Sequence, residues 1–239
     1  MNWSDTAYII GVRKHGENGA IVHLFTKTHG AAAGFVHGAS SKRLRGVLQP
    51  GVPVTATWRA RTHDQLGTLS LEPLGTIPPA LMASPLGLMS LQAIAALLFR
   101  VLPEGHPYQV LYDALDVLIE ALAGPDPVAA YIRFELLLLA QLGFGLRLDS
   151  CALTGTTDDL AYVSPKTGRA ANKAAGMPWH DRLLPLPAFL LTGKTGDVRE
   201  WLDGMRLTGY FLTEHLLADT SRRLPDARGR LVARLEGMI

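Results

Sequence analysis

The pair Pro78-Pro79 divides this sequence into two parts with different hydrophobic patterns. Before the pair, short runs rich in β-branched and aromatic residues are separated by glycine-containing turns, which is typical of β-strands. After the pair, apolar residues recur at helical spacing. The change predicts an α+β protein of two domains, a β domain over residues 1–79 and a helical domain over residues 80–239.

Five runs in the first part are predicted to be strands: Thr6–Lys14, Ile21–Thr28, Ala31–His37, Val52–Arg61 and Gly67–Leu74. The connections between them leave no room for crossover helices, so the strands are expected to pair antiparallel. Five short strands in about 75 residues predict a small antiparallel barrel. An OB-fold is the commonest barrel of this size and often binds nucleic acid, and an SH3-like barrel is the main alternative.

Helix signals dominate the second part. Ser84-Pro85 supplies an N-cap and a first-turn proline for a helix over 86–102, and Pro107 and Pro127 start two more. The helix after Pro127 is apolar on most of its circumference, which predicts a central position. Helix resumes over 197–217 and near 227–238. The segment between, about 146–196, lacks periodicity and is too long for a plain loop, so it contains either a small sub-structure or a mobile part.

A basic segment stands between the third and fourth predicted strands, with the sequence GASSKRLRGVLQP over 38–50. Lys42, Arg43 and Arg45 fall within four positions, and no acidic residue occurs between Asn18 and Arg61. Cations this close repel one another, and a polyanion such as a nucleic-acid backbone relieves that repulsion. The alternative is a solvated hairpin tip. Because residues 1–80 carry 8 Lys and Arg against 4 Asp and Glu, we favour nucleic acid.

The sequence contains no complete catalytic or metal-binding motif. Gly193-Lys194-Thr195 resembles the end of a P-loop, but Ala188 stands where that motif needs its first glycine. Asp158-Asp159 has no third carboxylate or histidine nearby, and Cys151, the one cysteine, cannot alone hold zinc. We therefore expect no enzymatic activity, no cofactor and no metal ion.

The N-terminal sequence MNWSDTAY is unlike a signal peptide. The most apolar run, 136–142, is far too short to span a bilayer, which needs about 20 residues. We expect a soluble, cytoplasmic protein with no membrane partner.

Several stretches, taken in order, resemble the RecO family of bacterial recombination mediators. They are Ala7-Tyr8-Ile9-Ile10, residues 38–45 leading to Leu48-Gln49-Pro50, Arg133-Phe134-Glu135-Leu136, Leu142-Gly143-Phe144, residues 162–168, Ala175-Gly176, and Leu212 with His215-Leu216. The likeness spans nearly the whole chain. It implies an N-terminal OB-fold, a helical body, and an irregular insertion shaped like a zinc knuckle.

The resemblance also implies a function. Such proteins bind single- and double-stranded DNA, anneal complementary strands, and work with the RecR clamp to load recombinase onto SSB-coated DNA. They dock the acidic, apolar C-terminal tail of SSB on the helical body, and their place is the cytoplasm, at the nucleoid. Many relatives hold zinc with two C-x-x-C pairs, whereas here Cys151 is accompanied by Thr154, Asn172 and Ala175. We therefore predict a knuckle without metal ligands, held by packing and hydrogen bonds.

Candidate binding residues follow from the resemblance and the charge pattern. The predicted DNA contacts are Lys42, Arg43 and Arg45, with Arg13, Lys14, Lys27, Arg59 and Arg61 as neighbours. Phe35 and Trp58 are more typical of a barrel core than of a base-stacking platform. For the SSB tail we predict Arg133, with His215 and Arg222 as secondary candidates.

Three alternatives remain open at this point. The C-terminal arginines, Arg222, Arg223, Arg228, Arg230 and Arg234, either extend the DNA path or form a solvated helix face. An OB-type RNA-binding or translation-associated module predicts a preference for structured RNA and no response to SSB. A nuclease predicts metal-dependent turnover that requires Asp158 or Asp159.

Overall fold

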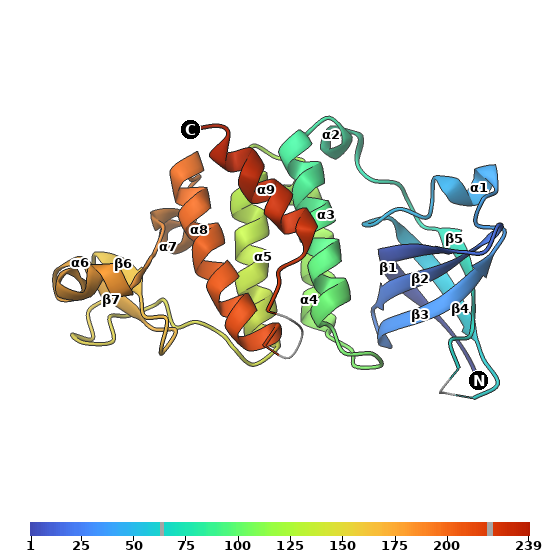
Figure 1. Ribbon diagram of the computed structural model, residues 1–239, viewed down its shortest axis with the longest axis horizontal. Helices are drawn as coiled ribbons and strands as arrows, with labels where there is room; N and C mark the ends of the chain where they lie inside the picture. The colour runs from blue at the N-terminus through green and yellow to red at the C-terminus, as the bar shows by residue number, and fades with distance from the viewer. Residues whose placement is uncertain (63–64, 219–221) are drawn as a thin grey trace. The chain divides into compact units, whose positions relative to one another are not determined.

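The computed structural model describes residues 1–62, 65–218 and 222–239 (Figure 1). The chain forms two compact units, Met1–Ala123 and Gly124–Ile239. The first unit contains the barrel together with the helices up to Ala123, so a domain boundary at residues 79–80 stays a prediction. None of the helices within the described ranges is long and apolar enough to cross a membrane.

The N-terminal strands close into a barrel of order β1-β2-β3-β5-β4. They are β1 (Asn2–His15), β2 (Gly19–Thr26), β3 (Gly30–His37), β4 (Pro53–Arg59) and β5 (Thr68–Pro73). Neighbours pair antiparallel except at the seam, where β3 meets β5 in parallel at Phe35 and Thr68. This is the small five-stranded barrel predicted from the sequence, and it is consistent with an OB-fold.

Strand β1 begins four residues earlier than the pattern of alternation predicts. Its first half, Asn2 to Tyr8, pairs with β4, and its second half pairs with β2. A register shift between Ile9 and Gly11 bends the strand at the change of partner, which is the usual role of a β-bulge. One long bent strand therefore serves two sides of the barrel.

The basic segment is not a plain loop, because it contains one helical turn, α1 (Lys42–Arg45). The Ser41 side chain accepts a hydrogen bond from the Leu44 N–H at 3.4 Å and caps the turn. Leu44 is buried in the barrel core, whereas the three cations around it are exposed. One apolar anchor thus fixes a turn whose remaining side chains face the solvent.

Three helices complete the first unit: α2 (Pro79–Met82), α3 (Pro85–Val101) and α4 (Gln109–Ala121). Ser84 caps α3 as predicted, accepting the Gly87 N–H at 3.1 Å. Barrel and helices meet through aromatic and polar contacts: the Tyr112 ring lies 5.4 Å from Tyr8 and 5.7 Å from Phe25, and the Tyr8 hydroxyl donates to Asp116.

The second unit is built around α5 (Pro127–Gln141), which is the central helix predicted from its apolar circumference. Beside it lie α7 (Ala188–Thr192), α8 (Val198–Phe211), a π-helical turn η2 (Leu212–Leu216) and α9 (Asp226–Glu236). Asp197 and Glu200 form a capping box at the start of α8.

A buried ion pair joins α5 to α9 and corrects one interpretation from the sequence. Arg228 is 3% exposed and donates two hydrogen bonds to the fully buried Glu135, at 2.7 and 2.9 Å. Thr208 and Tyr131 also donate to Glu135, each at 2.5 Å. Burial lowers the pKa of Arg228, but the charge of Glu135 and its hydrogen bonds more than reverse this and raise it. Arg228 is therefore neither part of a solvated helix face nor available to DNA.

The irregular segment is an ordered sub-structure, which settles the alternative left open by the sequence. It contains a three-stranded sheet of order β7-β6-β8, formed by β6 (Leu160–Val163), β7 (Ala170–Asn172) and β8 (Leu184–Pro185). A short helix α6 (Lys173–Gly176) and a 3₁₀ turn η1 (Met177–Arg182) connect β7 to β8.

Candidate nucleic-acid interface

A groove of about 680 Å³ lies between α1 and the β4–β5 side of the barrel. Its polar lining comprises His37, Arg43, Thr57, Arg59, Thr68 and Ser70. Among the described residues that line it, Glu72 is the only acid. Two guanidinium groups with hydroxyl donors between them match the phosphate oxygens of a nucleic-acid backbone.

The groove continues past the end of β4. A second hollow of about 540 Å³ shares Arg59 and Thr68 with the first and adds Arg61 and Gln65. The structure thus brings Arg43 of α1 onto the same path along the barrel as Arg59 at the end of β4 and Arg61 just after it. Spacing in the sequence could not reveal this, because the path depends on closure of the barrel between β3 and β5.

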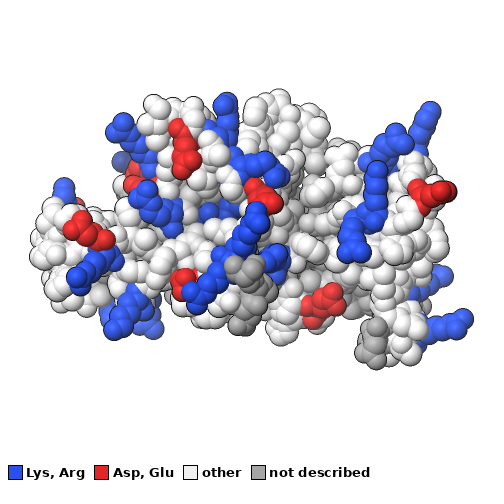
Figure 2. Space-filling view, in the orientation of Figure 1, with Lys and Arg blue, Asp and Glu red and all other residues white. Residues whose placement is uncertain are grey.

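The other predicted cations on α1 and β1 lie around the same end of the barrel. The Ala39 N–H donates to the Asn18 carbonyl at 2.9 Å, and the Ser40 hydroxyl donates to the Glu17 carbonyl at 3.1 Å. These bonds tie the α1 segment to the β1–β2 hairpin tip, next to which Arg13 and Lys14 are exposed. Figure 2 shows Lys and Arg side chains gathered over the part of the barrel that carries α1.

Lys27 is the exception among the predicted contacts. It follows β2, at the far end of that strand from the hairpin tip, and its ammonium group lies 3.0 Å from Asp113 of α4. The hydrogen bond and charge of Asp113 raise the pKa of Lys27. The structure therefore does not bring Lys27 to the groove, and its contact with DNA stays a prediction.

The two barrel aromatics have different positions. Trp58 is in the core, as expected, and its indole N–H lies 3.0 Å from the Ala33 carbonyl and 3.1 Å from that of Leu66. Phe35 is not in the core: Val36 beside it points into the barrel, so Phe35 lies on the outer face and is partly exposed. The sequence misled here because β3 is mostly glycine and alanine, and its alternation is weak.

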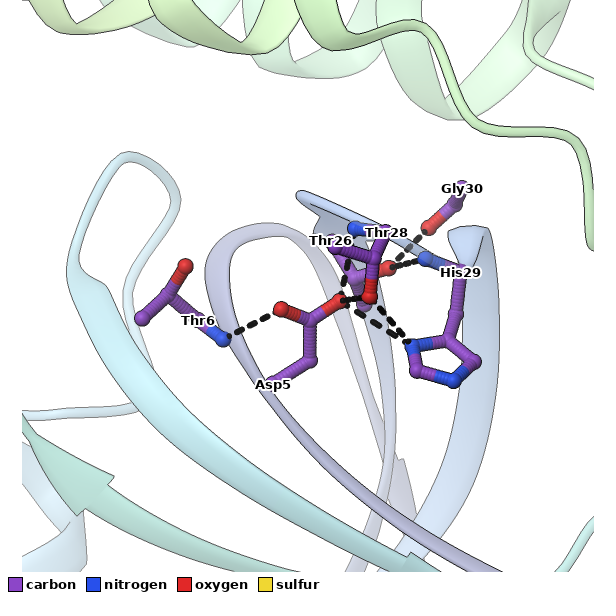
Figure 3. A network of polar contacts seen from close by, with 6 residues as sticks. All are labelled: Asp5, Thr6, Thr26, Thr28, His29 and Gly30. Atoms are coloured by element: carbon purple, nitrogen blue, oxygen red, sulfur yellow. Dashed lines mark hydrogen bonds and ion pairs between the residues drawn. The ribbon is translucent and has the colours of Figure 1, made fainter.

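At another place on the barrel, Asp5 ties the start of β1 to the β2–β3 turn (Figure 3). Its carboxylate accepts the Thr6 N–H at 2.8 Å, the Thr28 N–H at 2.7 Å, and the Thr28 hydroxyl at 2.8 Å. The Nδ1 atom of His29 lies 3.1 Å away. Burial raises the pKa of the Asp5 carboxyl, but these hydrogen bonds outweigh burial and leave the pKa below its usual 3.8. With an acid at its centre, this network is structural rather than a phosphate site.

We expect Asp5→Asn to lower the stability of the protein in a pH-dependent manner. Because the folded pKa of Asp5 lies below 3.8, its ionised form stabilises the fold above about pH 4. That contribution is lost as the pH falls through the folded pKa. Urea unfolding should show a loss of about 1–3 kcal/mol for the variant at pH 7, shrinking towards pH 3. Asp113→Asn, at an exposed ion pair, is the matched control, and a loss that does not change with pH would contradict the account.

The three residues predicted for the SSB tail do not form one pocket. Arg133 donates to the carbonyls of Phe189 and Lys194, both at 3.0 Å, and so holds the end of α7. His215 stacks on Phe144 at 4.8 Å, and Phe144 lies just beyond the C-terminal end of α5, the helix that carries Arg133. Arg222 lies 3.7 Å from Glu214.

A groove between α8 and α9 combines apolar and cationic groups more closely. Its volume is about 480 Å³, and Leu202, Met205, Tyr210, Leu224 and Val232 supply apolar lining. Arg206 and Arg228 also line it, as do two acids, Glu214 and Glu236. Sequence analysis missed this site because it depends on how two helices pack.

Two family models match the chain in the order of its architecture. The model described as Recombination protein O N terminal covers residues 1–76, and that described as Recombination protein O C terminal covers residues 83–223. The chain belongs to the RecO family. The two RecO models meet between the barrel and α3, so the matched regions correspond to the barrel and to the helical region with its insertion.

Curated relatives agree with this assignment over their full length. Proteins named DNA repair protein RecO from Caulobacter sp. (strain K31), Methylorubrum extorquens (strain PA1) and Phenylobacterium zucineum (strain HLK1) are each 47% identical to this chain, and the matches cover 98% of both chains. The RecO family identity gives this protein a role in DNA repair.

The insertion predicted to be a knuckle without metal ligands is held by hydrogen bonds around Cys151. The Asn172 N–H donates to the Cys151 sulfur at 3.3 Å, and its side-chain amide donates to Thr154 at 3.3 Å. The Ala175 N–H donates to the Asn172 side chain at 2.8 Å. One thiol, one hydroxyl and one amide do not make a zinc site. Within the described ranges, no cluster of three His, Cys, Asp or Glu is placed to hold a metal.

The Cys151 thiol takes part in this hydrogen-bonded knuckle. Burial raises its pKa, but hydrogen bonds from the Thr154 side chain and from the backbone of Asn172, Thr154 and Leu153 lower the pKa to about 7. Cys151, Thr154, Asn172 and Ala175 are thus held together by hydrogen bonds, as the sequence predicted.

Proposed function

We propose that this protein is a recombination mediator that binds and anneals single-stranded DNA and has no catalytic turnover. It also binds double-stranded DNA and, together with RecR, helps to load recombinase onto SSB-coated DNA. The observation that carries the proposal is the groove on the barrel, which Arg43 of α1 and Arg59 of β4 both line, with Lys42 and Arg45 exposed on the same turn as Arg43.

The chemistry of this groove suits strand annealing. Guanidinium groups and hydroxyls contact phosphates, which positions a strand without reading its sequence. Bases of a strand held by its phosphates keep their pairing edges free for a complementary strand. Neutralised phosphates also lower the repulsion between two strands.

The SSB tail is proposed to dock in the groove between α8 and α9. The tail is acidic and apolar, and it needs a cation beside an apolar surface. Arg206 is exposed at this groove next to Met205 and Tyr210, and its guanidinium lies 3.4 Å from the Asp203 carboxylate in a surface ion pair, a kind of contact that contributes little stability. Arg133 is a weaker candidate than it was from the sequence, because its guanidinium is engaged by two backbone carbonyls.

One experiment with two arms tests the proposal. In the first, fluorescence anisotropy measures binding to labelled single-stranded DNA across a salt series. Three or four phosphate contacts give a slope of log K against log salt of about −2 to −3, and Arg43→Ala/Arg59→Ala should flatten it by about 1.4. Lys166→Ala, at an exposed lysine of the other unit, is the matched control. A double variant with the wild-type slope would refute the groove.

The second arm measures binding of a labelled SSB tail peptide. Tyr210→Ala should weaken it, and His215→Ala, also an exposed aromatic of the same unit, should not. The reverse result would place the tail at the residues first predicted from the sequence. Binding to structured RNA in preference to single-stranded DNA, with no response to the peptide, would favour an RNA-binding module instead. Turnover of DNA that depends on Asp158 or Asp159 would favour a nuclease.

A further inference from the structure

Phe35 lies between two histidines on the outer surface of the barrel. The His15 ring is 5.8 Å from the Phe35 ring at an interplanar angle of 86°, and the His37 ring is 4.6 Å away at 78°. These three side chains come from β1 and β3, on either side of β2. They form an aromatic cluster outside the barrel core, which is filled by other residues, including Trp58.

The strand beneath Phe35 is shaped to receive its ring. A Cβ atom on Gly19 of β2 would lie 2.2 Å from the Phe35 Cζ atom, so only glycine leaves room for the ring at this place. The ring therefore lies across β2 at Gly19. A bare backbone at position 19 accommodates an aromatic side chain that remains partly open to solvent.

The cluster adjoins the phosphate groove. The Phe35 N–H donates to the Gly67 carbonyl at 2.9 Å, and Phe35 pairs with Thr68 across the barrel seam. Thr68 and His37 both line the groove that contains Arg43 and Arg59. A strand whose phosphates follow this groove therefore passes beside the partly exposed Phe35 ring.

We infer that Phe35, flanked by His15 and His37, is a stacking platform for an unpaired base of single-stranded nucleic acid. The inference rests on the proposed function, because it needs the groove to hold the phosphates. Stacking on an aromatic ring tolerates every base, since every base has a π-face. Duplex DNA has no unpaired base to offer, so the platform gives this site a preference for single strands.

The test compares two oligonucleotides that share a backbone and differ in their bases. A labelled oligothymidylate and an abasic oligonucleotide of the same length are titrated by anisotropy with wild type and with Phe35→Leu. The variant should bind oligothymidylate roughly 5- to 100-fold more weakly and bind the abasic strand as wild type does. Phe99→Leu, at a Phe that is 49% exposed on α3, is the matched control and should change neither affinity.

The outcomes separate this inference from the proposed function. Arg43→Ala/Arg59→Ala should weaken binding to both oligonucleotides, and wild type that binds neither would refute both proposals. If the arginine variant behaves as expected and Phe35→Leu binds oligothymidylate as wild type does, only the platform is refuted. An equal loss on both oligonucleotides would also refute it, because Phe35 would then only support the groove. Quenching of 2-aminopurine fluorescence by wild type but not by Phe35→Leu would report the stacked base directly.

Discussion

Arg228→Ala is expected to destabilise the second unit by about 3–5 kcal/mol, because it leaves the carboxylate of Glu135 buried without its cation. The two hydroxyl donors that remain, Tyr131 and Thr208, satisfy hydrogen-bonding capacity but not charge. In urea, this loss should shift the unfolding midpoint by roughly 1–3 M. Far-UV circular dichroism would follow the transition, since this unit is mostly helical.

Two further variants give this prediction its controls. Arg230→Ala removes an exposed arginine from the same helix and should change stability by less than about 0.5 kcal/mol. The double variant Glu135→Leu/Arg228→Met removes both charges and should recover much of the loss, because packed apolar groups can replace a buried ion pair. If Arg228→Ala and Arg230→Ala cost the same, the buried pair has no special role in stability.

Among glycine-to-alanine substitutions in the barrel turns, Gly30→Ala is expected to be the most destabilising, lowering the free energy of unfolding by about 2–5 kcal/mol. Gly30 has a φ of +71°, and a Cβ atom there would lie 2.2 Å from the carbonyl oxygen of His106. The nearest atoms that a Cβ at Gly30 would meet all belong to the His106 backbone, so no flexible side chain can move away to relieve the clash. The neighbouring Gly105 N–H donates to the Ala31 carbonyl at 2.9 Å, so relief of the clash would also disturb this contact.

Gly38→Ala separates the strain of a positive φ from the steric clash with His106, which together make up the expected loss of stability at Gly30. Gly38 has a similar φ of +65°, but nothing lies within 4 Å of a Cβ atom built there. It should therefore show only the strain of a left-handed alanine, about 1–2 kcal/mol. Thermal unfolding of both variants measures the difference. Equal losses would mean that the close approach of His106 is relieved at no cost.

The barrel and its order were predictable because each strand carries its own local signals. Turn residues between short β-patterned runs located all five strands, and the Ser84-Pro85 and Pro127 signals located helix starts to within a residue or two. The candidate groove was predictable only in part. The run Lys42 to Arg45 is visible as a charge cluster, but its meeting with Arg59 depends on closure of the barrel between β3 and β5.

Long-range partners account for what the sequence did not show. In the sequence, Arg133 and Arg228 have no evident partner and could each bind a ligand. The structure shows that Arg133 donates to the carbonyls of Phe189 and Lys194, and that Arg228 pairs with the Glu135 carboxylate. Neither partner can be recognised from the residues near these arginines in the sequence. Phe35 shows the converse case. In a strand of small residues an aromatic side chain suggests burial, but the direction of Phe35 follows from its register with Ile21 and Thr68, and Gly19 leaves room for its ring.

Because Cys151, Thr154 and Asn172 hold the knuckle by hydrogen bonds, this part of the protein needs no metal ion in order to fold. A site of four zinc-bound thiolates must capture a metal ion as a protein matures, and it can lose that ion to a chelator or its thiolates to an oxidant. Here hydrogen bonds within the chain hold these residues together. We expect the folding of this insertion to be independent of zinc supply, so that growth without the metal would leave it intact.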